Sequence, residues 1–167
     1  MRPEVHWIGL PIAGRLAIMA RPRASDWLDD EISGWRAEGI DIVVSLLEPE
    51  EVSELGLRRE AGLCREQGME FISFPIPDRG VPAALREARA LAQTVATKIA
   101  EGKAVAVHCR AGIGRSSLIA ACAFVCSGFD PETALDLIGK SRGVRVPDTE
   151  GQRDWVIAFR DAITLDA

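Results

Sequence analysis

The sequence predicts an α/β fold with a central, mainly parallel sheet and helices on both of its faces. Apolar runs of strand length, such as residues 41–47 (DIVVSLL) and 104–108 (AVAVH), are continuous rather than alternating, which is typical of strands buried on both faces. Segments of helical periodicity separate these runs, so consecutive strands need crossover connections and lie parallel. The 167 residues contain no linker-like segment and no internal repeat, and we expect one domain over residues 1–167.

The expected elements alternate along the chain. The strands are predicted at residues 5–8, 16–19, 41–47, 69–74 and 104–108, the first two as an antiparallel pair around Pro11 and Gly14. The helices are predicted at residues 25–39, 49–68 with a break at Gly56, 82–102, 116–127, 130–142 and after Pro147. Ser25 and Asp130 are the expected N-caps of two of these helices.

Composition excludes several classes of function. A net charge of −5 argues against an overall positive potential that would attract nucleic acid or an anionic membrane. A local basic pocket is still compatible with this charge. No apolar run approaches the ~20 residues that span a bilayer, and the N-terminus lacks the apolar stretch of a signal peptide. Four cysteines without an export signal are typical of reduced thiols in the cytoplasm. With two histidines and no CxxC pair, we expect no metal site and no cofactor.

One segment combines the features of an anion-binding loop. The run HCRAGIGRS (108–116) leaves the carboxyl end of a predicted strand and turns into a helix. In open α/β sheets ligands bind beyond the carboxyl ends of strands. Gly112 and Gly114 let the backbone curl with its N–H groups inward, and the helix start adds unpaired N–H groups and a positive dipole end. Arg115 provides a planar fork for two oxygens of a tetrahedral oxyanion.

Cys109 lies in the middle of this positive field. Helix N-termini and neighbouring cations stabilise a thiolate, so Cys109 is expected to be ionised at neutral pH. A buried cysteine is by itself most often inert. Here the preceding His108, the glycines, the arginine six residues on and the following Ser116 together indicate a nucleophile aimed at phosphorus.

The same segment resembles the HCxxGxxR[ST] signature of cysteine-dependent protein tyrosine phosphatases, in particular the small dual-specificity type. The resemblance extends over about residues 40–160. The run PIPD (75–78) resembles the general-acid loop of that family, and residues 141–159 are similar to the kinase-associated-phosphatase branch. The first 35 residues, approximately, match no family that we can assign.

The resemblance implies a role for each matching position. Cys109 would form a phosphocysteine, and Asp78 would protonate the leaving oxygen and later activate water. Ser116 would hydrogen-bond the Cys109 sulfur, and His108 would hold the loop backbone. Arg115 would clamp the equatorial oxygens. The phosphate-binding residues would be Arg110, Ala111, Gly112, Ile113, Gly114 and Arg115.

Other candidates have an ordinary structural interpretation as well. Asp78 between Pro77 and Arg79 also suits a turn. Gln152 falls where related enzymes sometimes place a water-orienting glutamine, yet an exposed helix residue is the default. Arg79, and with less support Arg145, are candidates for a second substrate charge. Cys64 is a candidate resolving thiol, whereas the other two cysteines, Cys122 and Cys126, are expected in the core.

The sequence therefore predicts a phosphatase that acts on phosphorylated proteins. We expect a monomer that binds neither nucleic acid nor a membrane. A phosphoinositide or RNA 5′-phosphatase is the alternative within the same chemistry; the variable loop positions offer one cation, Arg110, and no lysine. A rhodanese-like sulfurtransferase also uses a cysteine loop, but it has no use for Asp78. A phosphate-binding module without catalysis would not require both Cys109 and Arg115.

Overall fold

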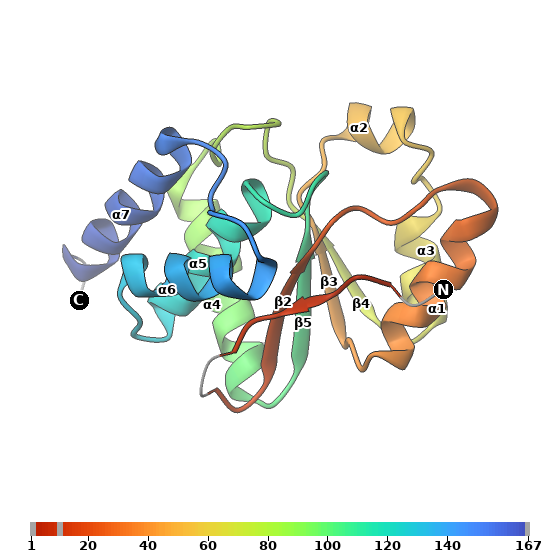
Figure 1. The fold of residues 1–167 in the computed structure, drawn as a ribbon, viewed down its shortest axis with the longest axis horizontal. Coiled ribbons are helices and arrows are strands. Elements are labelled where there is room, and N and C mark those ends of the chain that lie inside the picture. Colours follow the sequence, from red (N-terminus) through yellow and green to blue (C-terminus); the bar gives the residue numbers. More distant parts are fainter. Residues whose placement is uncertain (1–2, 10–11, 166–167) are drawn as a thin grey trace.

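Five strands form one mixed sheet in the computed structural model, which describes residues 3–9 and 12–165 (Figure 1). The strands are β1 (His6–Trp7), β2 (Arg15–Met19), β3 (Ile42–Ser45), β4 (Glu70–Ser73) and β5 (Ala104–His108), in the order β1-β2-β5-β3-β4. The pairings β2–β5, β5–β3 and β3–β4 are parallel, and β1–β2 is antiparallel. The predicted fold class is confirmed. Pro11, part of the expected first turn, lies outside the described residues.

The helices follow the predicted alternation; most are shorter than predicted, and α5 begins and ends one residue earlier. They are η1 (Ser25–Trp27, a 3₁₀ turn), α1 (Leu28–Ala37), α2 (Pro49–Glu54), α3 (Glu60–Glu66), α4 (Leu85–Ala100), α5 (Arg115–Cys126), α6 (Pro131–Arg142) and α7 (Glu150–Leu165). The predicted break between α2 and α3 falls at Gly56, whose φ of +69° suits a glycine. Asp130 caps α6, because its carboxylate accepts the Glu132 and Thr133 N–H groups at 3.1 and 3.3 Å.

The prediction of Ser25 as a helix N-cap is wrong. Ser25 lies inside η1 with a φ of +57°, and the N-cap of α1 is Trp27. The reason is that the chain enters α1 through a 3₁₀ turn, in which the Trp27 N–H donates to the Ala24 carbonyl at 3.3 Å. Such turns commonly precede helices and move the helix start along the chain.

The sheet separates two hydrophobic clusters. Helices α4, α5, α6 and α7 cover one face and α1 and α3 the other (Figure 1). Along β5, Val105 and Val107 contribute to the first cluster and Ala106 to the second, as the alternation of side chains along a strand requires. Helix α5 is the centre of its layer: every residue from Arg115 to Val125 is buried. Its first turn is therefore held firmly at the end of β5.

The three central strands end together. His108 at the end of β5 is paired with Met19 of β2 on one side and Ser45 of β3 on the other. The Leu46 N–H donates to the His108 carbonyl at 3.0 Å and extends this pairing by one residue. The segment 109–114 leaves the sheet from this point. Among the described residues, none of the helices is long and apolar enough to cross a membrane.

Candidate active site

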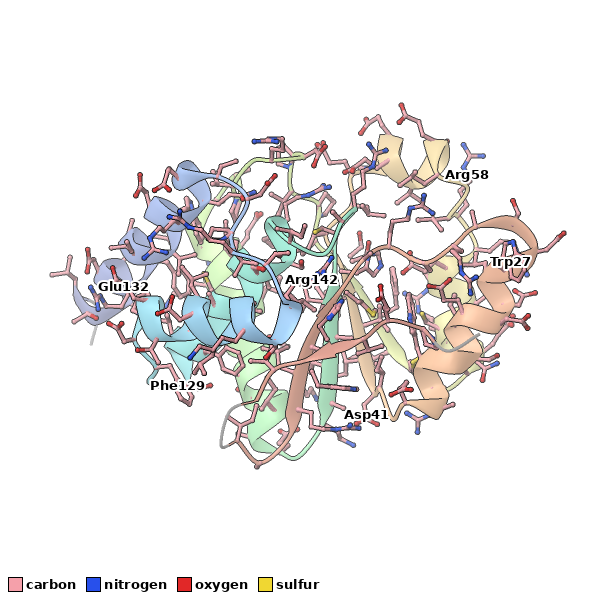
Figure 2. All side chains as sticks on the ribbon, in the orientation of Figure 1. Trp27, Asp41, Arg58, Phe129, Glu132 and Arg142 are labelled. Atoms are coloured by element: carbon pink, nitrogen blue, oxygen red, sulfur yellow. The ribbon has the colours of Figure 1, made fainter. Side chains whose placement is uncertain are left out.

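The segment 109–114, called here the cradle, is held from outside by its carbonyl oxygens. The Arg21 N–H donates to the Arg110 carbonyl at 3.2 Å. Arg142, at the end of α6, donates from Nη2 to the Ala111 carbonyl at 3.2 Å and from Nε to the Gly112 carbonyl at 3.1 Å. Figure 2 shows Arg142 between α6 and the ends of the strands. Because C=O and N–H of a trans peptide point in opposite directions, carbonyls held outward leave the N–H groups facing inward.

Gly112 makes this close packing possible. Its φ is +73°, and a Cβ at this position would lie 2.5 Å from the Met19 carbonyl carbon and 2.7 Å from the Ala20 nitrogen. Gly114 is closely packed on the other side of the cradle, where a Cβ would lie 2.8 Å from the Asp148 Cβ and 2.9 Å from Gln152 Oε1. The positive φ and the backbone contacts of Gly112 require glycine there, and the small size of Gly114 leaves room for the side chains of Asp148 and Gln152.

His108 holds the first peptide of the cradle from beneath. Its Nδ1 lies 3.3 Å from the Cys109 carbonyl oxygen and its Nε2 lies 2.5 Å from Glu60 Oε2 of α3. Both side chains are buried, and the Trp35 ring lies beside the imidazole with 6.0 Å between centroids. A carbonyl oxygen only accepts, so Nδ1 is the donor in its contact with Cys109. His108 is therefore fixed by Glu60 as a donor to the Cys109 carbonyl.

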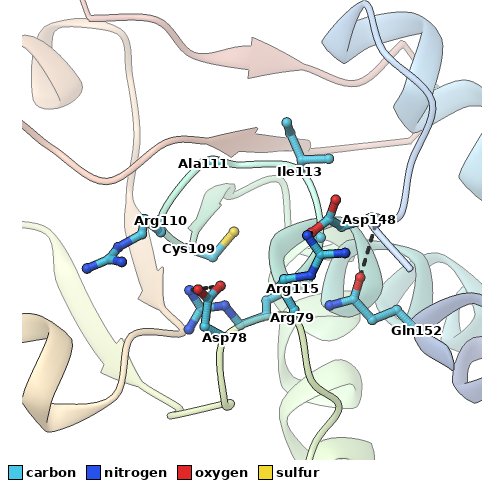
Figure 3. Close-up of a pocket in the computed structure, with 10 residues that line it drawn as sticks. Asp78, Arg79, Cys109, Arg110, Ala111, Ile113, Arg115, Asp148 and Gln152 are labelled. Carbon is cyan, nitrogen blue, oxygen red and sulfur yellow. Dashed lines mark hydrogen bonds and ion pairs between the residues drawn. The ribbon is translucent and has the colours of Figure 1, made fainter. Parts of the chain in front are cut away.

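Cys109 lies at the base of a cavity of about 230 Å³. The residue is 3% exposed, and its Sγ lies 3.3 Å from the Ser116 Oγ on α5. In Figure 3 the cradle arches around the Cys109 sulfur, with Asp78 and Arg115 beside it. The cavity is lined by Asp78, Arg79, Cys109, Arg110, Ala111, Ile113, Gly114, Arg115, Asp148 and Gln152. Most of the predicted site residues therefore face one space.

Arg115 is buried and held by Glu51, the third residue of α2. Its Nη1 and Nη2 donate to the two Glu51 carboxylate oxygens at 2.6 and 2.9 Å, and Nη1 also donates to the Ile76 carbonyl at 2.8 Å. Burial alone would raise the pKa of the Glu51 carboxyl, but hydrogen bonds from Arg115 and from the Glu48 N–H lower it below its ordinary value. Burial opposes the charge of Arg115 as well, yet Glu51 raises the pKa of the guanidinium. Both groups are thus ionised, and the plane of the Arg115 fork is fixed.

Asp78 approaches Arg115 from the opposite wall of the cavity. Its Oδ1 accepts from Arg115 Nη2 at 3.2 Å, while its side chain is 54% exposed. The turn that carries it, residues 77–80, is closed by the Gly80 N–H donating to the Pro77 carbonyl at 2.8 Å. We call this turn the acid loop. Asp78 is therefore both a turn residue and a carboxylate at the cavity, and the two interpretations of the sequence are compatible.

Three further candidates are placed differently by the fold. Gln152 is fully buried at the cavity, so its default interpretation as an exposed helix residue is wrong; the side chain fills the space between Gly80 and Gly114. Arg79 lines the cavity, with Nη1 3.7 Å from Asp148 Oδ2. Arg145 does not: its side chain is 83% exposed, and it pairs with Glu150 and lines another hollow.

The remaining cysteines lie in the hydrophobic interior or beside it. Cys64 is buried in the cluster on the α1/α3 face, whereas Cys109 belongs to the cluster on the opposite face. Burial, assisted by the nearby Glu60, raises the pKa of the Cys64 thiol to about 12. A protonated, buried thiol is a poor partner for disulfide exchange, which argues against Cys64 as a resolving thiol. Cys122 is fully buried in the core, as expected, and Cys126 packs against it.

Sequence reasoning missed the residues that support the site from a distance. Glu51, Glu60 and Arg142 contact Arg115, His108 and the cradle across 64, 48 and about 30 positions of the chain. Glu51 offered one signal, because a glutamate at the third position of a helix fits a capping box, and its carboxylate does accept the Glu48 N–H. Glu60 and Arg142 resemble ordinary helix-surface charges in the sequence.

A mainly parallel sheet that ends in a cysteine-containing, arginine-flanked cradle is the arrangement of the cysteine-dependent phosphatases, and the comparison with known families agrees. Residues 17–129 match the family described as "Polymorphic toxin system, DSP-PTPase phosphatase". The chain therefore belongs to the dual-specificity branch of the protein tyrosine phosphatases, which confirms the resemblance found in the signature.

Individual relatives agree with this assignment. The chain is 27% identical over 130 residues to cyclin-dependent kinase inhibitor 3 of Rattus norvegicus, covering 77% of this chain and 61% of the relative. The structure of kinase-associated phosphatase (KAP) superposes with a TM-score of 0.89 at 21% identity, covering 98% of this chain and 97% of that one. PTPMT1 in complex with PI(5)P superposes with a TM-score of 0.74 at 22% identity, covering 96% and 98%. The chain thus spans less than two thirds of its curated relative.

Proposed function

We propose that the protein hydrolyses phosphate monoesters through a phosphocysteine at Cys109. The observation that carries this proposal is the position of the Cys109 sulfur at the base of a cradle whose N–H groups face inward, beside the buried cation of Arg115. A thiolate in such a field is stabilised and nucleophilic, and a phosphoryl group is the anion that the cradle fits.

In the first step a lone pair of the Cys109 sulfur forms the S–P bond as the bond from phosphorus to the leaving oxygen breaks. The cradle N–H groups and the Arg115 fork stabilise the charge on the equatorial oxygens. Glu51 holds that fork in one plane, so little reorganisation accompanies the reaction. The Asp78 carboxyl transfers its proton to the leaving oxygen as the bond to phosphorus breaks.

In the second step water attacks the phosphocysteine. Asp78, now a carboxylate, accepts the proton of the water as the new P–O bond forms and the S–P bond breaks. The electron pair returns to sulfur as a thiolate, and the Ser116 hydroxyl, 3.3 Å from Sγ, stabilises it by donating a hydrogen bond. Inorganic phosphate then leaves and the site is restored.

Phosphorylated proteins are the proposed substrates. Among the described residues no aromatic side chain lines the cavity, and Asp78 at its wall is half exposed, which suits a shallow site open to phosphotyrosine and phosphothreonine or phosphoserine. The name of the rat relative refers to a cyclin-dependent kinase, a protein partner. A phosphoinositide is the second candidate, since the structural neighbour PTPMT1 binds PI(5)P.

Hydrolysis of p-nitrophenyl phosphate and its inhibition by vanadate test the chemistry. Cys109→Ser should abolish turnover, because a hydroxyl of the same shape is a poor nucleophile at neutral pH, while vanadate still binds. Turnover above a trace in this variant would remove Cys109 from the mechanism. A panel of phosphotyrosyl, phosphothreonyl and phosphoseryl peptides and of phosphoinositides then separates the substrate classes: a higher kcat/KM for the lipids would overturn the protein assignment.

A further inference from the structure

Gln152 joins the acid loop to the start of α7. Its Nε2 donates to the Gly80 carbonyl at 3.0 Å, and its Oε1 accepts the N–H groups of Asp148 and Thr149, both at 3.1 Å. The side chain is fully buried at the wall of the cavity (Figure 3). It therefore lies between the two halves of the site, the cradle and the loop that carries Asp78.

The orientation of this amide follows from its partners. Two N–H donors point at one end and a carbonyl oxygen at the other, so exchanging the oxygen and nitrogen would lose all three hydrogen bonds. An amide oxygen has two lone pairs, and both accept hydrogen bonds from the backbone directly before α7, from the N–H groups of Asp148 and Thr149. Gln152 in this position has no acceptor left for the proton of a nucleophilic water. The water-orienting role considered from the sequence is therefore not the one that this geometry supports.

The acid loop depends on contacts outside itself. Arg79 has a φ of +59°, a conformation that is unfavourable for a non-glycine residue and persists where the surroundings hold it. Among the residues that the structure describes, three side-chain contacts hold the loop: Arg115 with Asp78, Asp148 with Arg79 and Gln152 with Gly80. The Arg79–Asp148 pair is 3.7 Å long and exposed, so it contributes little. A bound phosphate would compete with Asp78 for the Arg115 guanidinium, so this contact weakens when substrate binds. Gln152 provides the buried contact that substrate does not compete for.

We infer that Gln152 is a positioning residue for the general acid. Its amide nitrogen holds the Gly80 carbonyl, and thereby sets the distance of Asp78 from the leaving oxygen. This inference rests on the proposed phosphatase function and adds a residue that acts on the first chemical step, before any water attacks.

Two variants at this position separate the amide from the side-chain volume. Gln152→Glu keeps oxygen acceptors for Asp148 and Thr149 but replaces the donor to Gly80 with a second oxygen. Gln152→Met keeps the volume and loses all three hydrogen bonds. Thr149→Ala is the matched control, because it removes the Oγ1 acceptor of the Gln152 N–H at the same helix start and leaves the amide in place. Circular dichroism and Tm identify any variant that fails to fold.

The readout is kcat/KM over a series of aryl and alkyl phosphates of increasing leaving-group basicity. A misplaced Asp78 matters where the leaving oxygen needs a proton, so both Gln152 variants should lose about 10–100-fold for poor leaving groups and less than about 3-fold for activated ones. Combining Gln152→Glu with Asp78→Asn should add no further loss, because both changes act on the same proton transfer. Thr149→Ala should lower Tm and leave the leaving-group dependence unchanged.

Two results would overturn the inference. In the first, the Gln152 variants keep their kcat/KM, but kcat falls for every substrate and a burst of product appears. This result would show that Gln152 acts on phosphocysteine hydrolysis, which is the water-orienting role. An equal loss of kcat/KM for all leaving groups would show a structural role alone. Failure of the phosphatase function looks different: the unmodified protein itself would then hydrolyse no member of the series.

Discussion

The cradle and the acid loop face the same cavity but are held in different ways. The cradle accepts hydrogen bonds from the Arg21 N–H just after β2, from Arg142 of α6 and from His108. Cys109 within it and Arg115 directly after it are 3% and 2% exposed. The acid loop follows β4, and the Asp78 side chain on it is 54% exposed. One part of the site is built into the interior, and the other is a surface turn tied to its neighbours.

The difference matches what each part is required to do. Stabilising charge on a phosphoryl group requires donors fixed before the reaction, since every reorganisation would subtract from the stabilisation. An acid has to let substrate enter and product leave, which a surface loop allows more easily than a buried one. Mutations on the cradle should therefore affect every substrate alike, whereas mutations on the acid loop should depend on the leaving group.

Arg115→Lys, on the cradle side of the site, should lower kcat/KM more than any other substitution considered. A lysine ammonium cannot form the two-oxygen fork on phosphate or the bidentate pair with Glu51, so kcat/KM should fall about 10³–10⁵-fold for all leaving groups. Steady-state kinetics over the leaving-group series measures it. Activity near that of the unmodified protein would remove the clamp from the mechanism.

Asp78→Asn should follow, with a loss that varies with substrate. For poor leaving groups kcat should fall about 10²–10⁴-fold, because the oxygen departs without its proton. For an activated phenol the loss should be much smaller, and the basic limb of the pH–rate profile should flatten. Equal losses across the series would reduce Asp78 to a turn residue.

Arg142→Ala should lower kcat/KM less than Arg115→Lys or Asp78→Asn does. Removing the donors to the Ala111 and Gly112 carbonyls loosens the cradle without touching phosphate, and a displacement of about 1 Å costs up to about 100-fold. The loss should be uniform across leaving groups, unlike that of Gln152→Glu. Arg145→Ala is the control, since Arg145 is exposed three residues further on and contacts Glu150 instead. Equal effects of the two variants would contradict the role of Arg142.

Glu51→Gln should lower the free energy of unfolding by an amount that depends on pH, and this is the smallest of the expected effects. We expect a loss of about 1.5–3 kcal/mol of unfolding free energy at neutral pH, because Arg115 keeps its charge while the carboxylate that pairs with it becomes a neutral amide. The pKa of Glu51 is lower in the folded protein than its ordinary value of 4.5, so the stabilisation is present above pH 4.5 and is lost as the pH falls through the lower, folded value. Urea unfolding at several pH values measures the difference between the two proteins, which should shrink below pH 4.5. A difference independent of pH would mean that the ion pair is not its source.

The local features of this protein can be predicted from its amino-acid sequence. Continuous apolar runs predicted the buried parallel strands, and the spacing of Cys109, Gly112, Gly114 and Arg115 predicted an anion-binding loop at the end of β5. These features are readable because strand burial, the positive φ of a glycine and the start of a helix depend on neighbours in the chain. The start of α1 was placed wrongly at Ser25 because an inserted 3₁₀ turn has little sequence signal.

The distant residues that support the site cannot be found without the packed fold. Glu60 reaches His108, Glu51 reaches Arg115 and Arg142 reaches the cradle because the sheet order places β5 between β2 and β3 and the helices over their ends. Nothing in the periodicity of α2, α3 or α6 distinguishes these charged side chains from solvated ones. Gln152 is the clearest case. Its place in a helical pattern predicts an exposed side chain, whereas in the fold this side chain is buried and links Gly80 to the start of α7. Burial and hydrogen-bond partners across the chain are properties of the packed structure, and a pattern of neighbouring residues does not contain them.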